Sequence, residues 1–198
     1  MPTIGLTGNF GMGKSTVLKM FAGMGAHTFN IDSYVHFILE KPAMIKRIVK
    51  VLGKSVLSKS SSKLSLNKKR MASMVFSDPE KRSAVEKIIH PEVLRLLKQA
   101  EAKILKKEPR AVIVFEVPLL YEAGYEKYFD KIVVVYSNRE NAIKRLAEKG
   151  FSNDEAFSRM RAQMPVSVKM KFADYSINNN YTLERTQNRV SRILAEIS

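Results

Sequence analysis

The chain of 198 residues carries 34 Lys and Arg residues against 19 Asp and Glu residues, a formal net charge of +15. Its length fits one compact domain, and its 45% hydrophobic and 27% charged residues are typical of a folded globular protein, which excludes a disordered or collagen-like chain. The absence of cysteine excludes disulfides, thiolate metal sites and a cysteine nucleophile.

No stretch of the sequence predicts a membrane span or a targeting segment. The apolar runs fall short of the roughly 18 residues that indicate a membrane-spanning helix. The first residues lack the basic head and apolar stretch of a signal peptide, and no lipidation motif is present. We therefore expect a cytoplasmic protein without a membrane partner, in agreement with the lack of cysteine.

The first predicted elements surround a cluster of glycines. The sequence predicts a strand over residues 3–7, a helix over residues 14–23 and a second short strand over residues 27–31. Six of the nine glycines fall within the first 25 residues, namely Gly5, Gly8, Gly11, Gly13, Gly23 and Gly25. Glycine allows positive φ angles and close approach of the backbone to a ligand, so this concentration indicates a functional loop.

The middle of the chain has helical patterns and most of the excess charge. Helices are predicted over residues 43–52, 66–76, 79–90 and 92–105. Residues 41–110 hold 19 basic and six acidic residues, a net charge of +13. We expect the 79 residues from Asp32 to Arg110, which contain no convincing strand, to form a helical insertion. Within it, the Ser- and Lys-rich residues 54–65 are expected to form a mobile loop.

The basic charge of this insertion allows two interpretations. It is either a solvated helical surface or a surface that attracts an anionic partner. A groove that stacks nucleic-acid bases would need aromatic residues among its cations, and Phe76 is the only aromatic residue between 41 and 110. We therefore expect no nucleic-acid partner.

The last part of the chain alternates strands with helices. Residues 111–117 and 131–136 are continuous β-branched runs, typical of strands buried on both faces, and residues 175–177 predict a last short strand. Helices are predicted over residues 138–149, 154–164 and 183–197. This alternation predicts an α/β fold, a five-stranded parallel sheet with helices on both faces in three layers.

A phosphate-binding loop lies between the first strand and the first helix. The match to G-x-x-x-x-G-K-[ST] comprises Gly8, Asn9, Phe10, Gly11, Met12, Gly13, Lys14, Ser15 and Thr16. The strand before it and the helix after it are the context that the motif requires. Backbone amides and the positive end of the helix bind phosphates, Lys14 reaches the terminal phosphates, and the Ser15 hydroxyl is a ligand for Mg²⁺. The sequence thus predicts binding of a nucleoside triphosphate.

The remaining motifs favour small-molecule phosphoryl transfer. None of the five Asp residues has Gly three positions later, so the D-x-x-G switch of a GTPase is missing, and the chain is short for a mechanical ATPase. A kinase needs a carboxylate that accepts the proton of the attacking hydroxyl. Asp32 follows the second predicted strand, and the C-terminal ends of parallel strands share one crevice. The alternative role for Asp32 is an N-cap of a helix that begins near Ser33.

Five blocks of the sequence together resemble the dephospho-CoA kinase family, a group of P-loop kinases. They run in the family's order from residue 5 to residue 179, namely GLTGNFGMGKST, FNID at 29–32, MVFSDPEKRSAVEKIIHPEV at 74–93, VPLLYE at 117–122, and a closing segment with Arg159, Gln163, Asp174 and Asn179. The resemblance implies ATP-dependent phosphorylation of the ribose 3′-hydroxyl of dephospho-coenzyme A, the last step of coenzyme A synthesis. It also implies one P-loop kinase domain over 1–198, with a helical acceptor-binding insertion over 33–110 and a helical lid over 138–164.

The resemblance also implies roles for residues on the acceptor side. Asp32 is the expected general base, and the expected acceptor contacts are Asp32, Arg82, His90, Pro91 and Glu122. A lone histidine is more often structural, and Lys87 competes with Arg82 as the cation facing the acceptor's pyrophosphate. Glu116 ends the third expected strand, where it either joins an outer-shell magnesium site or caps the next turn.

The lid is expected to bring arginines to ATP. Arg145 is the first choice for neutralising charge on the transferring phosphoryl group, ahead of Arg159 and Arg161. The alternative is that these arginines lie on solvated faces of two amphipathic helices. The sequence departs from the family's pattern in having Tyr34 in place of a second acid, Asn141 in place of Gln, and Lys68 and Lys149 in place of Arg.

The expected substrates are ATP, with Mg²⁺, and dephospho-CoA. The protein itself is expected to be a monomer or a small homo-oligomer. Two alternatives remain open on the residues alone. One is a P-loop kinase that acts on a nucleoside or nucleoside monophosphate. The other is an ATP-binding protein that uses the basic insertion to bind nucleic acid, with a steep dependence on salt.

Overall fold

The structure is a computed structural model that describes residues 2–58 and 64–197. Contacts between residues divide the chain into two compact units, one formed by residues 1–30 and 104–198 and the other by residues 31–103. The second unit overlaps the insertion that the sequence predicts over 33–110. Among the described residues, no helix is long and apolar enough to cross a membrane.

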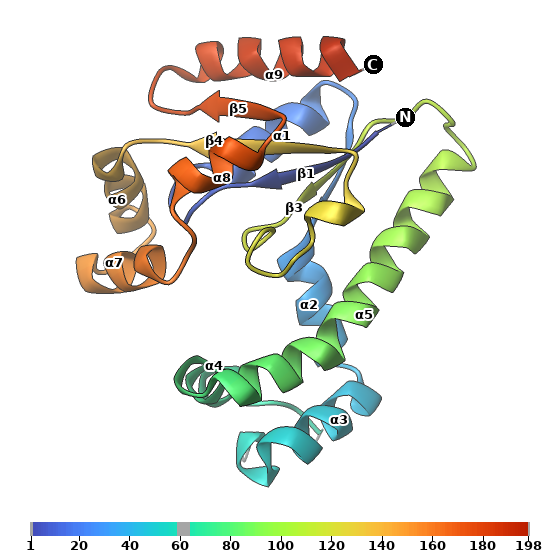
Figure 1. The fold of residues 1–198 in the computed structure, drawn as a ribbon, viewed down its shortest axis with the longest axis vertical. Coiled ribbons are helices and arrows are strands. Elements are labelled where there is room, and N and C mark those ends of the chain that lie inside the picture. The colour runs from blue at the N-terminus through green and yellow to red at the C-terminus, as the bar shows by residue number, and fades with distance from the viewer. Residues whose placement is uncertain (1, 59–63, 198) are drawn as a thin grey trace. The chain divides into compact units, whose positions relative to one another are not determined.

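The first unit is built on a five-stranded parallel sheet, as the sequence predicts. Its strands lie in the order β2-β3-β1-β4-β5 and all neighbouring pairs are parallel (Figure 1). Their bounds are β1 Thr3–Thr7, β2 His27–Asn30, β3 Ile113–Glu116, β4 Lys131–Tyr136 and β5 Tyr175–Asn178. The three central strands are buried on both faces, which explains their continuous apolar sequences.

Helices α1 (Lys14–Gly23) and α9 (Leu183–Ile197) pack on one face of this sheet. The shared core contains Ile4, Leu6, Val133 and Val135 from the sheet with Val17, Phe21, Val190 and Ile193 from the helices, all fully buried. Each such side chain contributes about 1.5–3 kcal/mol on burial. This core holds β1 and α1, which flank the phosphate loop, in a fixed orientation.

Helices α6 (Arg139–Ala147), α7 (Asn153–Arg161) and α8 (Val166–Phe172) follow β4. The side-chain oxygen of Asn138 caps the first turn of α6, and Ser152 and Glu155 form a capping box at the start of α7. The short α8 packs beside β4 (Figure 1). The sequence does not predict α8, because seven residues are too few to show a helical period.

The second unit is helical, with α2 (Ile31–Leu39), α3 (Pro42–Leu52), the 3₁₀ turn η1 (Lys54–Val56), α4 (Lys68–Ser77) and most of α5 (Pro79–Leu105). Its buried apolar residues include Ile38, Ile45, Ile48 and Val56. Part of the expected 54–65 loop is ordered, since η1 occupies its start and Leu57 pairs with Leu66 in an isolated antiparallel bridge. Residues 59–63 of that expected loop lie outside the described residues.

One helix replaces the two that the sequence predicts over 79–90 and 92–105. Pro91 lies inside α5, where it lacks the N–H that would bond to the carbonyl four residues earlier. The buried residues Val85, Ile89, Val93 and Leu97 recur every four positions across the proline and form one apolar stripe. Continuous burial of this stripe offsets the loss of one backbone hydrogen bond, so the prediction of a break at Pro91 is wrong.

The second strand is shorter than predicted. It ends at Asn30, and α2 begins at Ile31, so Asp32 lies within the first turn of α2. The alternative role of Asp32, as the N-cap of a helix that begins near Ser33, is therefore wrong. A carboxylate in the first turn still interacts favourably with the helix dipole.

Candidate nucleotide-binding site

The phosphate loop spans the six residues between β1 and α1, followed by Lys14, Ser15 and Thr16 in the first turn of the helix. Gly13 adopts a left-handed conformation with φ of 91° directly before α1. Within residues 2–58 and 64–197, no side chain caps the start of α1, and the first turn of this helix contains no acidic residue. The backbone amides of this turn can therefore bind an anion, and the helix dipole favours one.

Two glycines of the loop are required by close approach of the surrounding chain. A Cβ atom on Gly8 would overlap the carbonyl oxygen of Val135, and one on Gly13 would overlap Nδ2 of Asn179. Both residues also have positive φ, which an L-residue with a side chain rarely adopts. The loop thus lies tightly against β4 and the segment that follows β5.

Lys14 is held by the loop's own backbone. Its Nζ donates hydrogen bonds to the carbonyl oxygens of Gly8 at 2.8 Å and Asn9 at 3.1 Å, and only 8% of the residue is exposed. The ammonium group is therefore fixed against the main chain of the loop. Its expected role in binding terminal phosphates stays a prediction.

Ser15 is the candidate ligand for a cation, and Glu116 is the carboxylate bonded to it. The Ser15 hydroxyl donates to Oε1 of Glu116 at 3.2 Å, and Asn30 Nδ2 donates to Oε2 of the same carboxylate at 3.1 Å. Glu116 ends β3 and is 3% exposed. Hydroxyl and carboxylate oxygens suit Mg²⁺, which usually keeps several water and phosphate ligands. The described residues contain no cluster of three His, Cys, Asp or Glu side chains that could hold a metal by themselves.

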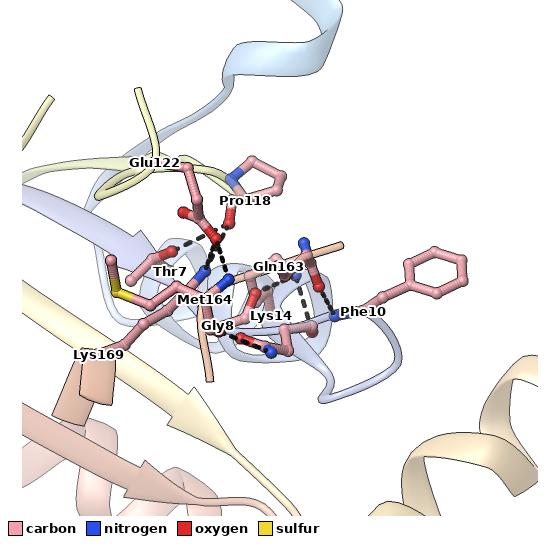
Figure 2. A network of polar contacts seen from close by, with 10 residues as sticks. Thr7, Gly8, Phe10, Lys14, Pro118, Glu122, Gln163, Met164 and Lys169 are labelled. Atoms are coloured by element: carbon pink, nitrogen blue, oxygen red, sulfur yellow. Dashed lines mark hydrogen bonds and ion pairs between the residues drawn. The ribbon is translucent and has the colours of Figure 1, made fainter. Parts of the chain in front are cut away.

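Two residues of the loop are bonded to the segment between α7 and α8. The Phe10 amide donates to Oε1 of Gln163 at 2.7 Å, and Asn9 Nδ2 donates to the carbonyl oxygen of Met164 at 3.0 Å (Figure 2). From the sequence, Gln163 is only one residue of the closing family motif and has no predicted role. These contacts fix the shape of the loop where it leaves β1.

Glu122 binds protein groups in this structure. Its Oε1 accepts a hydrogen bond from the Met164 amide at 2.9 Å and an ion pair from Lys169 Nζ at 2.9 Å (Figure 2). Lys169 is fully buried, and its Nζ also donates to the carbonyl oxygen of Pro118 at 3.3 Å. Lys169 belongs to none of the motifs found in the sequence, so the sequence does not predict a role for this residue.

Arg145 carries an unsatisfied donor beside the loop. Its Nη2 donates to the carbonyl oxygen of Asn179 at 2.6 Å, whereas its Nη1 is buried without a hydrogen-bond partner in the described part of the chain. A Cβ atom on Gly13 would lie 3.9 Å from that Nη1. A buried, unpaired guanidinium nitrogen is costly, so its place next to the phosphate loop indicates an anionic ligand there.

Asn179 supports both the loop and Arg145. Its Nδ2 donates to the carbonyl oxygen of Met12 at 3.0 Å, and its Oδ1 accepts from the Thr186 hydroxyl at 3.3 Å. The residue is 3% exposed. In the sequence Asn179 stands in a family motif without a predicted role, because Met12 and Arg145 lie far away in the chain.

Arg159 lies against aromatic rings at the edge of the loop. Its guanidinium group is 5.2 Å from the ring centroid of Phe10 and 4.9 Å from that of Phe151, and the two rings meet edge to face at 5.1 Å. The guanidinium group of Arg159 is thus within cation–π distance of both rings, and one of these rings belongs to the phosphate loop.

The other predicted site residues belong to the second unit. Asp32 lies in the first turn of α2, and the exposed Arg82 donates from Nε to the Val75 carbonyl at 3.2 Å and from Nη2 to the Phe76 carbonyl at 3.3 Å. Arg82 therefore satisfies carbonyl groups at the end of α4. Half-buried His90 precedes the exposed Pro91 in α5, and burial lowers the pKa of His90 although the negative charge of Glu86 opposes this shift.

Comparison with known proteins points to one family. A family model described as dephospho-CoA kinase matches residues 2–185. The dephospho-CoA kinase of Aquifex aeolicus is 35% identical over 100% of this chain and 98% of its own length. The solved structure of TT1252 from Thermus thermophilus has 32% identity and a TM-score of 0.85, covering 99% and 97% of the two chains. Dephospho-CoA kinase from Campylobacter jejuni has 27% identity and a TM-score of 0.68, covering 99% and 96%.

Proposed function

Because the chain belongs to the dephospho-CoA kinase family, we propose that it transfers the γ-phosphoryl group of ATP to the ribose 3′-hydroxyl of dephospho-coenzyme A. The observation that carries this proposal is the phosphate loop itself. Its support comes from the amides at the start of α1, the ammonium group of Lys14 in the same loop, and Nη1 of Arg145, which lies beside Gly13 and is unpaired among the described residues. Together they match the charge of a triphosphate.

The donor side of the reaction uses the first unit. The loop amides bind the β- and γ-phosphates, and Lys14 exchanges its contacts with the Gly8 and Asn9 carbonyls for the terminal phosphates. Mg²⁺, when bound, offsets phosphate charge, with Ser15 as its protein ligand and Glu116 oriented behind it. Arg145 stabilises charge that develops on the transferring group, and Arg159 binds ATP at the edge of the loop.

The acceptor side uses the second unit. Asp32 accepts the proton of the 3′-hydroxyl while the oxygen forms a bond to the γ-phosphorus and the bond from that phosphorus to the β,γ-bridging oxygen breaks, which releases ADP. His90, Pro91 and Arg82 bind the acceptor. The resemblance also implies acceptor contact by Glu122, whose Oε1 is bonded to Met164 and Lys169 within the first unit. Basic side chains between 41 and 110 attract the acceptor's pyrophosphate through a net charge of +13. The protein is further proposed to act in the cytoplasm as a monomer or small homo-oligomer, without a nucleic-acid partner.

The proposal is tested with a panel of acceptors. The protein is incubated with ATP and Mg²⁺ and with dephospho-CoA, nucleosides or nucleoside monophosphates, and ADP is measured, with Lys14→Met as the inactive control. Of the acceptors in the panel, we expect only dephospho-CoA to give ADP above background. Its product should be phosphorylated at the 3′ position. Turnover of a nucleotide acceptor without turnover of dephospho-CoA would instead favour a nucleoside monophosphate kinase.

A further inference from the structure

We propose that the buried ion pair between Lys169 and Glu122 positions the phosphate loop for ATP. Lys169, Glu122, Gln163 and Met164 form what we call the loop clamp. The role presupposes the kinase function proposed above and assigns to Glu122 a task on the donor side. All four residues belong to the first unit.

The first step of the clamp is contact with the loop. Asn9 and Phe10 are the second and third residues of the motif, and they bond to Met164 and Gln163 at 3.0 Å and 2.7 Å. The bond at Phe10 uses its backbone N–H, so it constrains the main chain of the loop directly. Gln163 and Met164 therefore determine where the loop amides point.

The second step orients Met164 itself. One oxygen of Glu122 accepts from the Met164 amide and pairs with Lys169, each at 2.9 Å. Lys169 also donates to the Pro118 carbonyl, which accepts from the hydroxyl of Thr7 at the end of β1. The ammonium group thus holds the carboxylate in the orientation that receives Met164, as Figure 2 shows.

The energetics of the pair favour a positioning role over a stabilising one. The side chain of Lys169 is 0% exposed and that of Glu122 is 21% exposed. Removing an ammonium group from water costs several kcal/mol, and a hydrophobic residue of similar volume is often as stable in such a place. What the pair provides is a fixed direction for the carboxylate and neutralisation of its charge beside a site for a polyanion.

The clamp also reaches Arg159. Helix α7 ends at Arg161, two residues before Gln163, and the guanidinium group of Arg159 lies over the ring of Phe10.

The kinetic effect of the clamp follows from when the loop becomes ordered. A loop without the clamp must be ordered when ATP binds. Bound ATP then holds the loop through its own contacts. The free energy needed to order the loop therefore raises KM for ATP and changes kcat only weakly.

The test is a double-mutant cycle of Lys169→Met and Glu122→Gln. We expect Lys169→Met to raise KM for ATP about tenfold, with kcat within about threefold and KM for dephospho-CoA within about twofold of the wild-type values. The double variant should be no weaker toward ATP than Lys169→Met alone, because both residues act as one unit. Lys171→Met, an exposed lysine on the same helix, is the matched control and should leave KM unchanged.

Three outcomes would overturn the clamp: a KM for ATP within twofold of wild type in Lys169→Met, single effects that multiply in the double variant, or a lowered melting temperature without a change in KM. If Lys169→Met does not fold, Glu122→Gln alone is tested with hydrogen exchange of the Phe10 amide, which should become faster; unchanged exchange would overturn the clamp.

ATP affinity measured by calorimetry without an acceptor separates this test from the choice of acceptor. Loss of ATP affinity in the variants supports the clamp even if dephospho-CoA is not the acceptor.

Discussion

Single residues of this protein show how polar groups are oriented by neighbours distant in the chain. Lys14 is held by backbone carbonyls of its own loop, whereas Arg145 and Glu116 are oriented by Asn179 and by Asn30 with Ser15. Nη1 of Arg145 is buried without a partner in the part of the chain that the structure describes, and we propose that a ligand's negative charge pairs with it. A substitution of one side chain can therefore be examined for its effect on ligand binding and, separately, for its effect on the chemical step.

At the residue scale, Asp32→Asn separates chemistry from binding. We expect kcat to fall about 10²–10⁴-fold, since a general base acts in the transition state, while the Kd for ATP stays within about threefold. Steady-state kinetics and calorimetry give the two quantities. Asp154→Asn is the matched control, because Asp154 also lies in the first turn of a helix and should change neither. Equal losses in kcat and ATP affinity would show a role in positioning.

At the element scale, α5 shows tertiary packing overriding a local signal. Pro91 interrupts the backbone hydrogen bonds of a 27-residue helix, yet buried residues on both sides of it continue along one face. The helix is thus stabilised by its packed stripe and destabilised at one exposed position.

Replacing Pro91 measures that local cost. We expect Pro91→Ala to raise the free energy of unfolding by about 1–3 kcal/mol, because the new N–H can bond to the carbonyl of Lys87 and alanine favours the helix. Urea unfolding provides the measurement, and Ser83→Ala, at another exposed position of α5, should change it by well under 1 kcal/mol. A less stable Pro91→Ala protein would show that the proline ring makes contacts worth more than the missing bond. A raised KM for dephospho-CoA in the same variant would support acceptor contact by Pro91.

At the scale of the whole molecule, ion pairs link stability to pH. Asp174 accepts a hydrogen bond from the Ile132 amide at 2.8 Å and pairs with Lys131 at 3.0 Å, which joins the starts of β4 and β5. Burial acts to raise the pKa of Asp174, but the hydrogen bonds and the positive charge outweigh it and hold the pKa below its usual value. A lowered folded-state pKa means that the carboxylate contributes stability above about pH 4 and loses that contribution as the pH falls through the folded value.

Asp174→Asn tests this linkage. We expect the variant to be about 1 kcal/mol less stable than wild type at pH 7, a modest value because the pair is partly exposed, and the difference to shrink toward zero as the pH is lowered below about 4. Chemical unfolding across this pH range gives the measurement, with Asp154→Asn as the control. A difference that stays constant with pH would contradict the assignment.

The phosphate loop, the five parallel strands and membership of the family could all be predicted from the sequence. The loop is one contiguous run of residues whose glycines and flanking strand and helix are local features. Continuous β-branched runs indicated the buried strands, because burial on both faces leaves no alternation. Local sequence determines such features, since the atoms involved are close along the chain.

Only the tertiary structure decided which side chains complete the site. Gln163 meets Phe10 across 153 residues, Asn179 meets Met12 across 167, and Glu122 turns toward Lys169 and Met164. The continuity of α5 through Pro91 was decided in the same way, by burial of a stripe. These outcomes depend on which segments the packed sheet and helices bring together, and long-range packing energy has no signature in the spacing of nearby residues.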